Sequence, residues 1–250
     1  MKRHLSLLIP LVLLAACNKT DDAPSAVAPA PAASQPADAG AAVDTATATE
    51  APAAPATSNA KANLVPDVDY VLIPNGQPLQ PLDGKAAEVV EVFAYWCGAC
   101  NAFEPTVNAW KNRLPGDVRF TALPLSGGAN DTLARLYYAA ETTGQLDKVH
   151  QTTFNAIHAE RALPPNSSAD ELLAYLGKKG VDTKALGEAM NSFAMTARLA
   201  QGFQFAQRSG VEGTPTLIVN GKYRILGRSH DEQLQIANAL IAQERTAAGQ

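Results

Sequence analysis

The stretch VVEVFAYWCGACNAFEP, residues 89–105, contains two of the chain's three cysteines, and only two residues separate them. The run of β-branched and aromatic residues over 87–96 predicts a buried strand that ends at this pair. Beyond Cys97, apolar residues recur at a helical spacing, at Phe103, Val107, Trp110 and Leu114. We therefore expect a strand, a turn at the cysteines and a helix that Pro105 should kink.

Further strands are predicted on both sides of this unit, at 65–74 and 117–125, and a block of helices follows the second one. The expected helices are Asp131–Thr143, Leu146–Ala159, Ala169–Lys179 and Thr183–Arg208. The later segment TPTLIVNGKYRIL, residues 214–226, is typical of a hairpin because it has two apolar runs around an Asn-Gly turn.

Ser229 and Glu232 match a capping box that would open a last amphipathic helix. Its apolar positions are Leu234, Ile236, Leu240 and Ile241. The predicted order is strand, strand, helix, strand, a block of helices, hairpin and helix. This order indicates an α/β chain with a helical insertion at about 128–208.

The first 16 residues match a secretory signal, because a basic start precedes an apolar run too short to span a bilayer. That length disfavours a transmembrane anchor. The run ends in Leu14-Ala15-Ala16-Cys17, which resembles the lipobox of bacterial lipoproteins and implies lipid attachment to Cys17. An ordinary signal peptide with an incidental cysteine is the alternative. In the enterobacterial sorting rule, Asn18 weakly favours the outer membrane.

Residues 17–63 are rich in Ala, Pro, Thr and Ser and predict a disordered, partly extended tether. Residues 64–250 are long enough for one globular domain with its own core. The formal net charge of −4 gives no basic field for nucleic acid, which we exclude as a partner. The four histidines do not cluster with the cysteine pair in the sequence.

The cysteine pair has three possible roles: metal binding, an inert disulfide, or electron exchange. A structural zinc site usually needs four N or S ligands, and the sequence has no second Cys-x-x-Cys or histidine pair. A disulfide between neighbours this close restricts little chain entropy, so it would stabilise the fold poorly.

Electron exchange explains more of the sequence. Cys97 should lie at a helix N-terminus, where free N–H groups and the helix dipole favour a thiolate. Cys100, one turn later, would then resolve a mixed disulfide. The small Gly98 and Ala99 would let a bulky protein substrate approach.

The chain resembles the DsbA family of bacterial disulfide oxidants, within the thioredoxin superfamily, over residues 65–243. The resemblance rests on FAYWCGACNAFEP, the helical block and GVEGTPTLIVNGKY. It implies a thioredoxin-like fold with an inserted helical domain and a cis Thr214–Pro215 bond packed against the cysteines. It also implies that Glu91 is a buried acid beneath them, although an exposed strand edge is the alternative. Glu104 matches a second acidic position, or is a solvated helix residue.

Three departures from the family pattern concern the redox properties. Ala99 stands where histidine is usual, Gly98 where proline is common, and Ala122 where the following strand carries a basic residue. Each loss should stabilise the Cys97 thiolate less. We expect the pKa of Cys97 to lie between about 7, as in thioredoxin, and about 3.5, as in the most oxidising members. We likewise expect the reduction potential to lie between about −270 mV, as in thioredoxin, and about −120 mV, as in those members. Titration by thiolate absorbance tests this, and a pKa below about 4 would refute it.

The resemblance implies a monomeric periplasmic thiol:disulfide oxidoreductase that oxidises reduced, unfolded exported proteins. Such an enzyme would need no metal and no cofactor beyond the Cys97–Cys100 disulfide. A DsbB-like membrane protein would reoxidise the cysteine pair. Trp96 and Tyr95 would belong to the substrate surface, or else to the core. A reductase or isomerase kept reduced by a membrane donor is the alternative, followed by a tethered chaperone or partner-binding module.

Overall fold

The computed structural model describes residues 60–61 and 63–249. The expected signal peptide (1–16), the lipidation site Cys17 and nearly all of the expected tether (17–63) lie outside these residues. The described residues form a five-stranded mixed sheet and a set of helices, in the predicted order of elements.

The sheet has the order β1-β5-β4-β2-β3. Its strands are β1 (Tyr70–Leu72), β2 (Ala87–Phe93), β3 (Val118–Pro124), β4 (Thr216–Val219) and β5 (Tyr223–Ile225). β2 pairs in parallel with β3 and antiparallel with β4, and every residue of β2 is buried. The cysteine pair therefore follows directly from an interior strand whose position is fixed from both sides.

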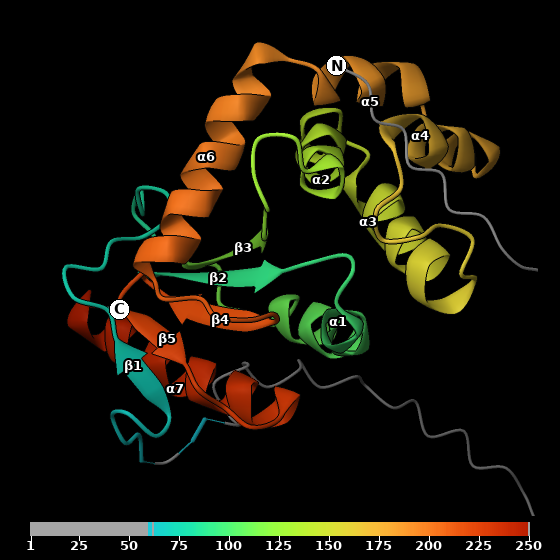
Figure 1. Cartoon of the computed structure of the whole chain (residues 1–250). Helices are drawn as coiled ribbons and strands as arrows, with labels where there is room; N and C mark the ends of the chain where they lie inside the picture. The colour runs from blue at the N-terminus through green and yellow to red at the C-terminus, as the bar shows by residue number, and fades with distance from the viewer. Residues whose placement is uncertain (1–59, 62, 250) are drawn as a thin grey trace, which may run out of the picture. The chain divides into compact units, whose positions relative to one another are not determined.

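The helices are α1 (Gly98–Lys111), α2 (Thr132–Thr142), α3 (Leu146–Phe154), η2 (Asn155–Ala159), α4 (Ala169–Lys178), α5 (Thr183–Met190), α6 (Phe193–Arg208) and α7 (His230–Ala247). Figure 1 shows α1 and α7 on one face of the sheet and the block from α2 to α5 on the other. The inserted helical block thus lies between β3 and β4 in the sequence.

Two apolar clusters cover the two faces of the sheet, and alternate residues of the central strands point into each. Val89 belongs to the cluster with α1 and α7, whereas Val90 belongs to the cluster with the helical block. Leu217 and Ile218 of β4 divide in the same way. This alternation is the period-2 pattern of a pleated strand, so the sheet forms the middle layer of the domain.

Two of the expected helices differ from the prediction. The expected helix Thr183–Arg208 is divided at Asn191 and Ser192, which close α5 and begin α6. The Asn191 side chain donates to a carbonyl of α5, and Ser192 has extended backbone angles. Both residue types favour helix ends over helix interiors. The expected helix 146–159 changes from α- to π-helical hydrogen bonding at Asn155.

The first strand is much shorter than the predicted range 65–74. Residues 65–69 form a turn, in which the N–H groups of Val68 and Asp69 donate to the Val65 carbonyl at 3.2 and 2.9 Å. The Asp69 carboxylate accepts from the Val65 N–H at 2.8 Å and stabilises that turn. β2 also ends earlier than predicted, because the Cys97 N–H donates to the Ala94 carbonyl.

The helix after the cysteines has the predicted buried face of Phe103, Val107 and Trp110. Leu114 lies beyond its end and packs on the same cluster while partly exposed. Pro105 lies within α1, which continues to Lys111.

The predicted hairpin and last helix are present. Asn220 and Gly221 both have positive φ, as the turn between β4 and β5 requires. Ser229 caps α7 by accepting from the Glu232 N–H, but the Glu232 carboxylate accepts from the Arg228 N–H, so the capping box is only half formed.

Lys61 belongs to the folded domain although it lies within the range expected for the tether. Its N–H donates to the Gln235 carbonyl in α7 at 3.0 Å. Its ammonium lies 2.7 Å from Asp69 and 3.3 Å from Glu232. The predicted domain boundary at residue 63 is therefore too late. Within the described residues, every helix is too short or too polar to cross a bilayer.

Candidate redox site

Cys97 occupies the N-cap of α1, at the end of the turn that follows β2. Its sulfur accepts a hydrogen bond from the Cys100 N–H at 3.3 Å, and its thiol donates to the Thr214 carbonyl at 3.2 Å. Cys97 is partly exposed, whereas Cys100 is 1% exposed. The two thiols are free in this structure. One sulfur can therefore be attacked by an outside thiolate and the other cannot.

The environments of the two sulfurs shift their pKa values in opposite directions. Burial alone would raise the pKa of Cys97, but hydrogen bonds from Thr214 and from the first turn of α1 bring it below its ordinary value. Burial raises the pKa of Cys100 far above its ordinary value. At neutral pH the exposed cysteine is thus the better thiolate and the buried one holds its proton.

The loop that faces the cysteines contains a cis Thr214–Pro215 peptide bond, as the family resemblance implies. The Thr214 carbonyl of this loop accepts from the Cys97 thiol, 117 residues away in the sequence. The Thr214 hydroxyl is buried without a partner of good geometry among the described residues, yet it favours the thiolate form of both cysteines. While the cysteines are thiols, the hydroxyl has no acceptor for its proton among those residues. It is therefore free to donate a hydrogen bond when a cysteine becomes a thiolate.

Glu91 lies inside the sheet rather than at an exposed strand edge. It belongs to β2, pairs with Ala122 and Leu217, and is 2% exposed. Burial raises the pKa of Glu91 to about 8, the Glu104 charge adds to the rise, and Lys111 opposes it. Glu91 is therefore a neutral acid at pH 7 that can gain or lose a proton near physiological pH.

Glu104 is also buried, at 7% exposure, so the alternative of a solvated helix residue is wrong. Its carboxylate accepts from Asn108 at 2.6 Å and bonds to His150 Nε2 at 2.9 Å. Burial alone would raise the pKa of Glu104, but the contact with His150, the hydrogen bond from Asn108 and the Lys111 charge together more than offset this and lower it. Two buried carboxyls thus have opposite preferences, one neutral and one charged.

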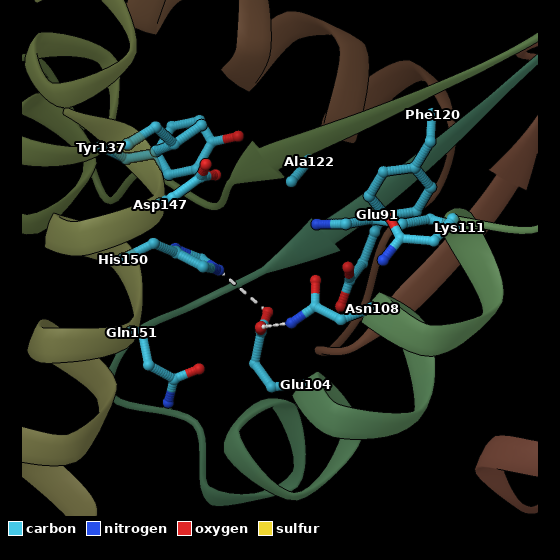
Figure 2. Close-up of a pocket in the computed structure, with 12 residues that line it drawn as sticks. Glu91, Glu104, Asn108, Lys111, Phe120, Ala122, Tyr137, Asp147, His150 and Gln151 are labelled. Carbon is cyan, nitrogen blue, oxygen red and sulfur yellow. Dashed lines mark hydrogen bonds and ion pairs between the residues drawn. The ribbon is translucent and has the colours of Figure 1, made fainter. Parts of the chain in front are cut away.

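Both carboxyls line a cavity of about 350 Å³. Figure 2 shows it between α1, β3 and α3, with the Glu104 contacts dashed. Ala122 contributes only a methyl group where the family's basic residue would stand, and Lys111 of α1 is the cation in the same cavity. The loss of charge expected at Ala122 is therefore partly offset by a lysine from another element.

The four remaining residues expected near the substrate differ in exposure. Gly98 and Ala99 are exposed beside Cys97, and Trp96 is 51% exposed. Tyr95 is 1% exposed and packs against Phe93, in agreement with the core alternative. Trp96 can therefore contact a substrate directly, whereas Tyr95 cannot.

Two histidines that sequence analysis did not connect to the cysteines meet Tyr95. His150 Nδ1 lies 2.8 Å from the Tyr95 hydroxyl, and His158 Nε2 lies 2.8 Å from the Tyr95 carbonyl oxygen. Both come from the helical block, and His158 is within the π-helical segment η2. Because they are more than 50 residues from Tyr95, no local pattern indicates the contact. Across residues 60–61 and 63–249, no three His, Cys, Asp or Glu side chains are grouped to hold a metal.

Comparison with known proteins gives a consistent result. The profile of a family described as DSBA-like thioredoxin domain matches residues 88–239. The thiol:disulfide interchange protein DsbA of Pseudomonas syringae pv. tomato is 38% identical over 185 residues, which cover 72% of this chain and 84% of that protein. The structure of the oxidoreductase DsbA from Xylella fastidiosa is similar with a TM-score of 0.69 and 37% identity, over 73% of this chain and 98% of that one. DsbA from Pseudomonas aeruginosa gives a TM-score of 0.67 at 37% identity, over 73% and 95%.

Proposed function

This chain belongs to the DsbA-like thioredoxin domain family, and from that premise we propose that it is a periplasmic thiol:disulfide oxidoreductase that introduces disulfide bonds into exported proteins. The observation that carries the proposal is the asymmetry of the cysteine pair. Cys97 is accessible with a lowered pKa, and Cys100 is buried with a raised pKa. This is the arrangement needed for a sulfur that exchanges with substrate and a second sulfur that resolves.

The reaction starts from the oxidised Cys97–Cys100 pair. A substrate thiolate attacks Cys97 Sγ, a mixed disulfide forms, the Cys97–Cys100 bond breaks, and Cys100 leaves as a thiolate that takes a proton. A second substrate thiolate attacks the substrate sulfur of the mixed disulfide and releases the Cys97 thiolate. The substrate loses two electrons and gains a disulfide, and the cysteine pair is reduced.

Glu91 supplies the proton that Cys100 takes and recovers it when the pair is reoxidised. Its burial keeps it protonated at neutral pH, and the cavity that it lines connects it to other polar groups. Reoxidation requires a membrane partner that accepts the two electrons, which we assign to a DsbB-like protein. The active group is the disulfide itself, without a bound cofactor or metal.

Unfolded substrate binds beside Trp96 and the strand edge next to Thr214. Half of the Trp96 side chain is exposed next to Cys97, and the main chain at Thr214 already accepts a hydrogen bond from the cysteine. An extended peptide can bind there through backbone hydrogen bonds, which require no particular sequence. The exposed Gly98 and Ala99 leave room for it, and the protein acts as a monomer.

The deciding experiment is the redox state of Cys97 and Cys100 in growing cells, by acid trapping and thiol alkylation. A mostly oxidised pair is expected. A mostly reduced pair would instead favour a reductase or isomerase that receives electrons across the membrane. A Cys97→Ser variant should fail to complement a deletion strain, and full complementation would favour a chaperone or binding module.

Lipid attachment to Cys17 is a separate part of the proposal, supported by the Leu-Ala-Ala-Cys sequence alone. The lipid would anchor the protein to a membrane, and Asn18 weakly favours the outer one. Labelled palmitate should be incorporated into the wild-type chain and not into a Cys17→Ser variant. Equal labelling of the two would contradict lipidation at this residue, and membrane fractionation would identify the membrane.

A further inference from the structure

Three buried or half-buried side chains, from α1, from α3 and from the turn before Cys97, form a continuous chain of hydrogen bonds behind the cysteine pair. Glu104 Oε1 lies 2.9 Å from His150 Nε2, and His150 Nδ1 lies 2.8 Å from the Tyr95 hydroxyl. Figure 2 shows the His150 ring directed at Glu104 across the cavity. Both ring nitrogens of His150 therefore form hydrogen bonds, one with a residue of α1 and one with a residue of the segment that leads to Cys97.

The geometry defines the state of the imidazole. The lowered pKa of Glu104 makes it an acceptor, so Nε2–H must donate. The buried Tyr95 keeps its proton, because burial raises its pKa, and Nδ1 is the single acceptor for that proton among the described residues. A neutral His150 with its proton on Nε2 satisfies both contacts. A charged ring would leave the Tyr95 proton buried without a partner.

The surroundings hold the ring in this place. Phe93, Tyr137 and Phe154 pack against it with centroid distances of 5.1, 5.7 and 5.1 Å. The other titratable or charged groups that face the cavity are Glu91 from β2, Lys111 from α1, Tyr137 from α2 and Asp147 from α3. Ala122 brings no charge from β3.

We propose that His150 is a positioning residue of the redox centre: it holds the Glu104 charge beside Glu91 and fixes Tyr95, two residues before Cys97. The helical block thereby takes part in the redox equilibrium although it contributes no group to the reaction itself. His158 supports the arrangement by bonding the Tyr95 carbonyl oxygen from η2. The role in catalysis rests on the proposed function, but the effect on the two carboxyls does not.

The test is a pair of variants whose side chains differ in hydrogen bonding. Glutamine has both a donor and an acceptor and can replace a neutral imidazole, whereas leucine has neither. In His150→Leu, Glu104 loses a charge-assisted bond, so its pKa should rise by about one unit. Glu104 stays ionised at the pH where Glu91 titrates, but its carboxylate is no longer held in place by His150. Its repulsion of Glu91 should therefore weaken, and the pKa of Glu91 should fall. His150→Gln should restore much of both shifts.

The measurement is carboxyl ¹³C NMR on protein labelled at glutamate, with the Glu91 and Glu104 resonances followed against pH. The two carboxyls interact, so both must be followed. The pH profile of thiol–disulfide exchange at Cys97 should move with Glu91. Gln151→Leu, an exposed neighbour of His150 on the same cavity, is the matched control and should leave both titrations unchanged.

Unchanged titrations of Glu91 and Glu104 in a folded His150→Leu variant would overturn the proposal. If that variant does not fold, imidazole ¹⁵N NMR of the wild type decides: a proton on Nε2 and an Nδ1 that accepts from Tyr95 are expected, and a proton on Nδ1 would overturn the proposal. A reduced cysteine pair in cells would contradict the proposed function alone, because neither NMR measurement depends on the direction of electron flow.

Discussion

Replacing Glu91 by glutamine should stabilise the protein, and the gain should depend on pH. The folded-state pKa of about 8 compares with 4.5 for an exposed glutamate. Below about 4.5 the carboxyl is neutral in both the folded and the unfolded chain, so it imposes no cost. As the pH rises from there to about 8, the unfolded chain ionises first, and the free energy of unfolding falls.

The size of the effect follows from the pKa difference. One pKa unit corresponds to about 1.4 kcal/mol, so above pH 8 the buried carboxyl destabilises the fold by about 5 kcal/mol relative to its contribution at low pH. Because Glu91 is 2% exposed, solvent screening reduces this figure little. Glutamine is neutral at every pH. The stability difference between Glu91→Gln and wild type should therefore grow by about 3 to 5 kcal/mol between about pH 5 and pH 9.

Urea unfolding of both proteins at several pH values, with the cysteines kept reduced, gives this difference. Glu188→Gln, an exposed carboxylate on α5, is the control and should show a flat difference. If the Glu91→Gln difference is the same at both ends of the pH range, then Glu91 is ionised in the folded protein at neutral pH. The assignment of a neutral acid, and of a proton donor to the buried cysteine, would then be wrong.

Other substitutions test the remaining contacts. Thr214→Val removes the hydroxyl that favours the thiolate, so the pKa of Cys97 should rise by about one unit in a thiolate absorbance titration; an unchanged value would mean that the hydroxyl does not reach the sulfur. Glu88→Ala removes the buried carboxylate that pairs with Arg119 and accepts from the Leu79 N–H, so it should lower the free energy of urea unfolding by about 3 kcal/mol; a loss under about 1 kcal/mol would contradict a structural role for these contacts. Gly202→Ala places a Cβ 2.8 Å from a tyrosine hydroxyl of α2, so overpacking should exceed the gain in helix propensity and lower Tm, whereas a higher Tm would show that the contact relaxes.

The elements around the cysteines could be predicted from the sequence because each has a local signal. A run of β-branched and aromatic residues predicted β2, an apolar run predicted β4, the Asn220-Gly221 pair predicted the hairpin, and the helical spacing after Cys97 predicted α1. Asn191 and Ser192 also carried a local signal for a helix end, but the apolar pattern continues through them, so the break between α5 and α6 was missed.

The environment of the site could be predicted only in part. Glu91 stood out because a carboxylate within an apolar strand is unusual. Glu104 was indicated only through the family resemblance, and His150 was not indicated at all, because polar residues on amphipathic helices usually face solvent. The 46 residues between them also hide their contact. Only the packing of the helical block on the sheet determines that both face a cavity rather than bulk water.

The contact between Cys97 and the Thr214 carbonyl joins residues 117 positions apart. A chain emerges N-terminus first, so the cysteines leave the ribosome long before the loop that faces them. The same loop brings the Thr214 hydroxyl, whose hydrogen bond lowers the pKa of Cys97. Until the loop arrives, the Cys97 thiol is closer to an ordinary cysteine, with a pKa of about 8.5. The nascent chain therefore carries a weakly reactive dithiol, and full reactivity appears only when the last quarter of the domain has folded onto it.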